Sequence, residues 1–130
     1  MSSSERRTRR FLRRNSVPVV AHGLAEYGIG GLCVAAPFLF SFDSDRATAA
    51  AVLIGGGILM LALLSDYPTA AVRRLPLESH IVLDYVFGVL LVAAPFIFGF
   101  SGKTGVTAFF VLLGLSYLAL SLATRYRRNR

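Results

Sequence analysis

The sequence predicts an all-α membrane protein in which four transmembrane helices form two tandem parallel two-helix repeats. Two observations lead to this prediction: four long apolar runs that carry almost no charge, and a residue pattern that occurs twice along the chain. The 130 residues have the length of one domain. Hydrophobic residues make up 55% of the chain, which is too apolar for a soluble domain of this size.

Each apolar run is long enough to cross a membrane, because a helix of about 18 or more apolar residues spans the hydrocarbon core. The predicted helices occupy residues 19–40, 47–64, 80–100 and 106–123. At 1.5 Å per residue, each would be roughly 27–33 Å long. The helices divide the chain into a basic tail (1–17), a first repeat (18–64), a loop (65–75), a second repeat (76–123) and a second basic tail (124–130).

The net charge of +7 lies almost entirely outside these runs. Most of the 14 Lys and Arg residues fall in the tails and the central loop, whereas the predicted turns 41–46 and 101–105 contain only Arg46 and Lys103. The positive-inside rule therefore predicts that both termini are cytoplasmic. We expect the following basic side chains to contact lipid headgroups: Arg9, Arg10, Arg13, Arg14, Arg73, Arg74, Arg125, Arg127 and Arg128.

A sequence pI near 10.5 would usually point to nucleic acid as a partner. Membrane topology already explains where these arginines lie, so we predict no nucleic-acid partner. Residues 8–13 resemble a twin-arginine export motif, but the spacing differs and no small-residue cleavage site follows an apolar region of suitable length. We interpret the first tail as a basic segment that rests against anionic headgroups.

The repeat is visible when residues 18–42 are aligned with residues 76–100. Both segments follow the pattern P-x3-H-x3-[ED]-Y-x2-G-x-L-x-V-A-A-P-F-x-F-x-F. Because each unit contains two helices, both copies enter the membrane from the same side, and the repeats would be related by a pseudo-two-fold axis along the membrane normal. At 100° per residue, the repeated positions share one helix face. We expect this face to pack the first predicted helix against the third.

Four ionisable residues lie on that repeated face. His22–Glu26 and His80–Asp84 are spaced four residues apart, which places each pair on one side of its helix. If the two helices touch, both imidazoles and both carboxylates converge near the cytoplasmic end of the spans. Ionisable groups inside membrane spans are costly and are candidates for function.

Several roles for these four residues remain open at this point. They could bind a divalent metal ion, the histidines could be axial ligands of a haem, or the cluster could relay protons. Alternatively, each histidine pairs with its own carboxylate, or with a tyrosine, at the membrane interface, where water is close. We predict no cofactor, and the identity of any metal stays open.

Prolines and small residues mark helix packing. Pro37 and Pro95 lie near the outer ends of the first and third helices, where we expect kinks that let phenylalanines pack. Small residues at helical spacing allow close approach of helices, either within the chain or with another protein. In the second and fourth helices these small residues are Ala47, Ala51, Gly55, Gly114, Ala119 and Ala123.

A proline flanked by a small residue and an aromatic, near the outer end of the first helix of a two-helix unit, resembles the SPW-repeat family of small bacterial membrane proteins. The family's Ser-Pro-Trp motif corresponds to residues 36–38 and 94–96, which both read Ala-Pro-Phe here. The resemblance covers most of the chain outside the tails. It implies the two-by-two helix architecture and a bacterial cytoplasmic membrane, but no function.

No catalytic residues are predicted, and we do not expect an enzyme. The single cysteine, Cys33, lies in an apolar run with no base beside it in sequence, and it excludes an intrachain disulfide. We therefore predict a non-catalytic structural or accessory membrane subunit. Its expected partners are the lipid bilayer and either another membrane protein or further copies of itself. The alternatives are an oligomeric transporter or channel component and a haem- or metal-binding subunit.

Overall fold

The computed structural model describes residues 2–6, 18–64 and 76–124 of the chain. Its main elements are α2 (Val19–Leu39), α3 (Asp45–Leu64), α4 (Leu77–Ile97) and α5 (Thr104–Ala123). All four are long and apolar enough to cross a membrane. The predicted all-α class with four spans is therefore confirmed. The headgroup arginines, most of both tails and the loop 65–75 lie outside the described residues.

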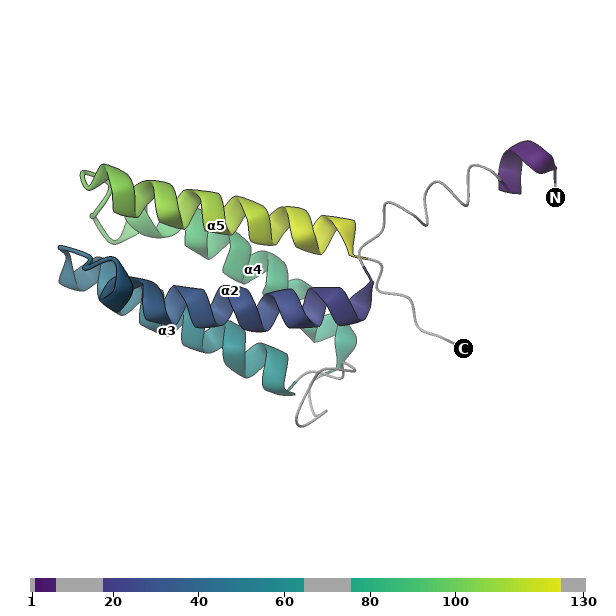
Figure 1. Cartoon of the computed structure of the whole chain (residues 1–130), viewed down its shortest axis with the longest axis horizontal. Helices are drawn as coiled ribbons and strands as arrows, with labels where there is room; N and C mark the ends of the chain where they lie inside the picture. The colour runs from purple at the N-terminus through teal and green to yellow at the C-terminus, as the bar shows by residue number, and fades with distance from the viewer. Residues whose placement is uncertain (1, 7–17, 65–75, 125–130) are drawn as a thin grey trace.

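The helices form two hairpins that lie side by side (Figure 1). The closest backbone packing is within each hairpin, between α2 and α3 and between α4 and α5. Fewer contacts join α3 to α4 and α2 to α5. The prediction that the first and third predicted helices pack directly against each other was therefore wrong. The face of α2 that allows close packing lies against α3, and that of α4 lies against α5. Side chains from α2 and α4 therefore contact each other across the interior of the bundle.

Glycine pairs explain why each hairpin is so tight. A Cβ atom added at Gly55 of α3 would lie 2.9 Å from the carbonyl oxygen of Gly30 on α2. In the second hairpin, a Cβ added at Gly114 of α5 would lie 2.9 Å from the carbonyl oxygen of Gly88 on α4. Real Cβ atoms do not approach backbone this closely, so each pair fixes a short distance between helix axes.

The small residues predicted to pack helices do so in part. Ala47 and Ala51 are fully buried, and Gly55 and Gly114 face the neighbouring helix of their own hairpin. Ala119 and Ala123 are exposed on α5, so of the two predicted alternatives only contact with another protein or another copy stays open for them. Spacing alone places residues relative to one another, but the absolute rotation of α5 follows from Gly114 facing α4.

The helix ends differ from the predicted ones, most of all in the second repeat. The third span begins at Leu77 and ends at Ile97, whereas residues 80–100 were predicted. Pro76 precedes it in an extended conformation, and Glu78 in its first turn favours a helix start there. Phe98 and Phe100 continue the apolar run beyond the last helical residue, so a boundary drawn from hydrophobicity lies beyond the end of the helix.

Both α2 and α4 end in the same capping arrangement. The N–H of Phe42 donates to the carbonyl of Pro37 at 3.0 Å, and the N–H of Phe100 donates to the carbonyl of Pro95 at 2.9 Å. This bond is the signature of a Schellman cap. Both prolines lie in the last helical turn, so there is little helix beyond them, and the predicted kinks stay a prediction.

The two caps differ at their left-handed residue, which yields a stability prediction. This position is Ser41 with φ 51° in the first repeat and Gly99 with φ 76° in the second. We expect Ser41→Gly to stabilise the protein by about 1 kcal/mol and Gly99→Ala to destabilise it by about 1 kcal/mol, because only glycine adopts positive φ without strain. Thermal unfolding in detergent measures both changes. If Ser41→Gly and Gly99→Ala changed the stability in the same direction, the assignment of Ser41 and Gly99 as the left-handed cap residues would be contradicted.

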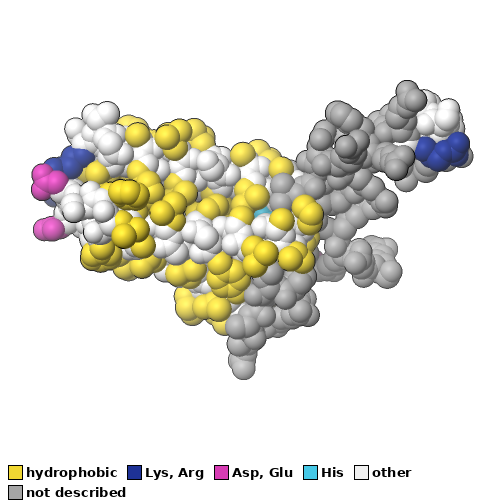
Figure 2. Space-filling view, viewed as in Figure 1, with side chains coloured by type: hydrophobic (Ala, Val, Ile, Leu, Met, Phe, Trp, Pro, Cys, Tyr) yellow, Lys and Arg dark blue, Asp and Glu magenta, His cyan; other side chains and the backbone are white. Residues whose placement is uncertain are grey.

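Contacts near each end of the bundle tie the hairpins together. At the end with the short turns, Phe42 packs edge-on against Phe109 with ring centroids 5.6 Å apart, and its ring lies 6.3 Å from that of Phe110. At the end where α2 starts and α5 stops, the tie is polar and is described below. Figure 2 shows hydrophobic side chains along the visible face of the bundle and charged side chains gathered at the turn end. These charged residues are Asp43, Asp45, Arg46 and Lys103.

Candidate functional site

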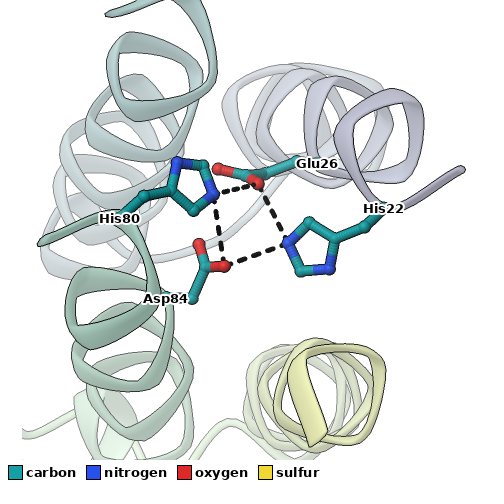
Figure 3. Close-up of side chains that lie close together, drawn as sticks. All are labelled: His22, Glu26, His80 and Asp84. Atoms are coloured by element: carbon teal, nitrogen blue, oxygen red, sulfur yellow. Dashed lines mark hydrogen bonds and ion pairs between the residues drawn. The ribbon is translucent and has the colours of Figure 1, made fainter. Parts of the chain in front are cut away.

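The four candidate residues meet in the interior of the bundle. His22 and Glu26 lie in the first two turns of α2, and His80 and Asp84 lie in the first two turns of α4. Figure 3 shows their side chains converging from the two helices. All four are 0% exposed. They lie roughly 5–10 Å from the start of their helices at 1.5 Å per residue.

Nitrogen and oxygen atoms alternate around a closed ring in this cluster. His22 Nε2 lies 3.1 Å from Glu26 Oε2 and 3.0 Å from Asp84 Oδ2. His80 Nε2 lies 3.0 Å from Glu26 Oε2 and 3.2 Å from Asp84 Oδ2. Each histidine thus contacts the carboxylate of its own helix and that of the other helix (Figure 3). The contacts are reciprocal between the two repeats.

Two sequence-based alternatives for the cluster can be compared with this geometry. Each histidine does pair with the carboxylate of its own helix, but it also contacts the other carboxylate, and all four side chains are buried rather than exposed at a wet interface. A haem between the two imidazoles would need its ring plane to pass between them. Glu26 Oε2 and Asp84 Oδ2 occupy that space, each within 3.2 Å of both Nε2 atoms. The histidines as placed are therefore not a haem-ligand pair.

A threonine fixes the protonation of His22. The hydroxyl of Thr124, the residue after α5, donates its only hydrogen to the carbonyl of Leu120 at 2.6 Å. Thr124 Oγ1 also lies 2.6 Å from His22 Nδ1, so there it can only accept. His22 therefore carries a hydrogen on Nδ1. In the neutral imidazole, Nε2 then presents a lone pair to the ring.

A tyrosine orients Asp84. The hydroxyl of Tyr117 on α5 donates to Asp84 Oδ1 at 2.6 Å, which leaves Oδ2 directed at the two histidines. Tyr117 is itself fully buried. Sequence reasoning missed both Tyr117 and Thr124. A tyrosine in the middle of an apolar span was a usable signal, because its hydroxyl needs a partner there. Nothing in the sequence indicated that Thr124 would reach His22.

The first hairpin lacks the equivalent of that tyrosine. Ile58 lies three residues after Gly55, as Tyr117 lies three residues after Gly114. Because Ile58 is apolar, it offers no hydroxyl, and Glu26 Oε1 is buried with no hydrogen-bond partner. The ring is therefore symmetric in its four inner atoms and asymmetric in its surroundings. Glu26 is the carboxylate with a spare acceptor.

Removing the Tyr117 hydroxyl should destabilise the protein measurably. Tyr117→Phe leaves Asp84 Oδ1 buried without its donor, and such a loss costs about 1–3 kcal/mol. Chemical unfolding in detergent, followed by circular dichroism, measures the change. Tyr27→Phe is the matched control, since its hydroxyl donates to the carbonyl of Ala62 at a longer 3.3 Å and is only half-buried. Equal losses in the two variants would contradict the special role of Tyr117.

A separate groove of about 470 Å³ opens near the turn end and includes Arg46 and Phe98 in its lining. None of the four cluster residues lines it. The chemistry-bearing side chains and the open cavity are therefore in different parts of the molecule. Because the cluster is sealed within the chain, it does not line an open path, and the transporter alternative stays a prediction.

Four apolar spans that enclose a buried ring of ionisable side chains near one end of the bundle define a multi-pass membrane protein. The chain matches the family model of the SPW repeat domain over residues 20–124, and it belongs to the SPW repeat family. This confirms the resemblance seen around residues 36–38 and 94–96. No curated protein and no solved structure matches the chain.

Proposed function

We propose that this protein is a non-catalytic membrane subunit that acts through helix packing, as a structural or accessory part of a larger membrane assembly. The assembly would contain another membrane protein or further copies of this chain. We also propose that it resides in a bacterial cytoplasmic membrane with both termini in the cytoplasm, because the basic residues of the sequence lie beside that end of the spans.

The observation that carries the proposal is an outward-facing stripe on α2. Ala21, Leu24, Gly28 and Leu32 are all exposed, and a Cβ added at Gly28 would meet nothing within 4 Å. A small residue at the centre of an exposed stripe lets another helix approach closely. The same position on α4 is Val86, which is 50% exposed, so the second repeat does not offer this shallow surface.

The described connections within the hairpins also favour a packing role. The turns that follow α2 and α4 cover only residues 40–44 and 98–103. Neither turn contains a domain that could carry chemistry outside the membrane. Within the described residues, the surface available to a partner is therefore the apolar side of the bundle (Figure 2).

The test compares Gly28→Leu with Val86→Leu in full-length protein purified in mild detergent. Native mass spectrometry and site-specific cross-linking from Leu24 would report a defined homo-oligomer or a stoichiometric membrane partner. We expect Gly28→Leu to abolish that complex and Val86→Leu to leave it intact, since neither change disturbs the interior. A wild-type chain that is always monomeric and partner-free, or a complex indifferent to Gly28→Leu, would refute the proposal.

A further inference from the structure

We propose that His22, Glu26, His80 and Asp84 form a binding site for one divalent first-row transition metal ion, with Zn²⁺ the best fit. The inference goes beyond the packing role proposed above and does not depend on it. Each residue offers one ligand atom, and the four atoms lie within 4.8 Å of one another. Two imidazole nitrogens and two carboxylate oxygens are the donors that zinc accepts in four-coordinate sites.

The spacing of the ligand atoms suits an ion of this size. A tetrahedral ion with bonds of about 2.0–2.1 Å separates its ligand atoms by about 3.3–3.4 Å. The four nitrogen–oxygen distances around the ring are 3.0, 3.0, 3.1 and 3.2 Å. The four neighbouring distances around the ring thus lie within a few tenths of an ångström of that spacing, and all ligand atoms lie within 4.8 Å of one another. Figure 3 shows that the four donor atoms already face a common centre.

Hydrogen placement also favours a cation in the ring. Since Thr124 takes the Nδ1 hydrogen of His22, a neutral His22 directs a bare Nε2 lone pair at two carboxylate oxygens. Facing lone pairs at 3.0–3.1 Å repel unless a positive centre, either a proton on His22 Nε2 or a metal ion, lies between them. A metal ion provides that centre for His22 Nε2 and for both carboxylates together.

A divalent metal ion also satisfies the charge balance of the ring. Glu26 and Asp84 bring two negative charges into a fully buried position inside an apolar bundle. Buried charges must be compensated by opposite charge or by a metal ion. One divalent ion bound by neutral histidines cancels the two carboxylates without further change.

The surroundings resemble the outer shell of a metal site. Metal-bound histidines usually donate their second nitrogen to an oxygen, as His22 Nδ1 does to Thr124, and metal-bound carboxylates are hydrogen-bonded, as Asp84 is by Tyr117. Glu26 Oε1 is a buried oxygen without a hydrogen-bond partner. A cation at the ring centre would give this carboxylate the electrostatic partner that the chain itself does not supply.

The experiment uses full-length protein in mild detergent, carrying a purification tag without histidine. The protein is stripped with a chelator, reloaded with ZnCl₂ or CoCl₂, and freed of excess metal. We expect one Zn²⁺ per chain by elemental mass spectrometry and the visible absorption of four-coordinate Co²⁺. The variant His22→Gln/His80→Gln should lose both signals. Tyr117→Phe should keep the site and weaken Zn²⁺ binding about 10–100-fold.

Two controls separate this site from incidental binding. Glu78→Gln removes an exposed carboxylate from the first turn of the same helix, and Cys33→Ala removes the single thiol; both should keep one Zn²⁺ per chain. Circular dichroism confirms that each variant is folded, and the graded loss in Tyr117→Phe remains informative if the double variant is not. Folded wild-type protein that binds neither ion, or a His22→Gln/His80→Gln variant that binds as tightly, would overturn the proposal.

Discussion

Replacing Asp84 by asparagine is expected to lower the free energy of unfolding by about 3–5 kcal/mol, the usual cost of breaking a buried charged pair from one side. Asp84 Oδ2 contacts both His22 Nε2 and His80 Nε2, and its Oδ1 accepts from Tyr117. An amide keeps the shape but offers one acceptor where the carboxylate offers two. The change therefore disturbs the whole ring. Unfolding in mixed detergent micelles, followed by circular dichroism, measures the loss.

Asp43→Asn is the matched control for that prediction. Asp43 pairs with Lys103 at 3.2 Å, but its side chain is fully exposed in the turn after α2. An exposed ion pair is screened by water and salt, so we expect no measurable change in stability. The comparison holds the chemical substitution constant and varies only burial. Similar losses for Asp84→Asn and Asp43→Asn would show that the ring does not stabilise the bundle.

Gly55→Ala is expected to destabilise the protein by about 1–3 kcal/mol through overpacking. The added Cβ would lie 2.8 Å from Cys33 Cβ and 2.9 Å from the carbonyl oxygen of Gly30. Both are atoms of a helix that cannot yield without separating α2 from α3. The added methyl group must therefore push the two helices apart, which also loosens contacts along the rest of the hairpin. Reduced thermal stability in detergent is the expected readout.

The neighbouring glycine provides the control. A Cβ added at Gly56 meets nothing within 4 Å, so Gly56→Ala should be neutral or stabilise the helix by up to about 1 kcal/mol through its higher helix propensity. The two substitutions are identical and adjacent, and they differ only in the direction in which the Cβ points. If Gly56→Ala were as damaging as Gly55→Ala, the assigned rotation of α3 would be incorrect.

Much of the fold could be predicted because apolar length and repeat pattern are direct consequences of membrane insertion. Four spans, their order and the tight turns between them follow from runs that water would not tolerate. The helix ends could not be predicted as well. Phe98 and Phe100 are as apolar as the helix before them, and only the left-handed residue Gly99 and the Schellman bond mark where α4 stops.

The four ring residues of the candidate site could be predicted, whereas the supporting residues Tyr117 and Thr124 could not, for a physical reason. The pairs His22–Glu26 and His80–Asp84 follow from helical periodicity, which is local in sequence. The way the pairs meet is not local. Each hairpin packs closely on itself at its glycines, and these four side chains of α2 and α4 meet across the bundle. The bond between His22 and Thr124 joins residues 102 positions apart, which no periodicity reveals.

The two repeats contribute equally to the ring but differ in the residues that support it. The inner ring is reciprocal, because each histidine contacts both carboxylates. The supporting residues are not, because Tyr117 serves Asp84 while Ile58 stands at the matching place near Glu26. All four ring residues thus belong to the pattern shared by residues 18–42 and 76–100. Because Ile58 offers no hydroxyl, Glu26 Oε1 has no hydrogen-bond donor.

The central claim is that these four side chains surround one divalent ion inside the membrane bundle, and X-ray absorption of Zn²⁺-loaded protein tests it most directly. The account predicts four nitrogen or oxygen ligands at about 2.0–2.2 Å, with outer-shell scattering from two imidazole rings and none from sulfur. Failure to retain zinc, a shell without imidazole, or a sulfur ligand from Cys33 would contradict it.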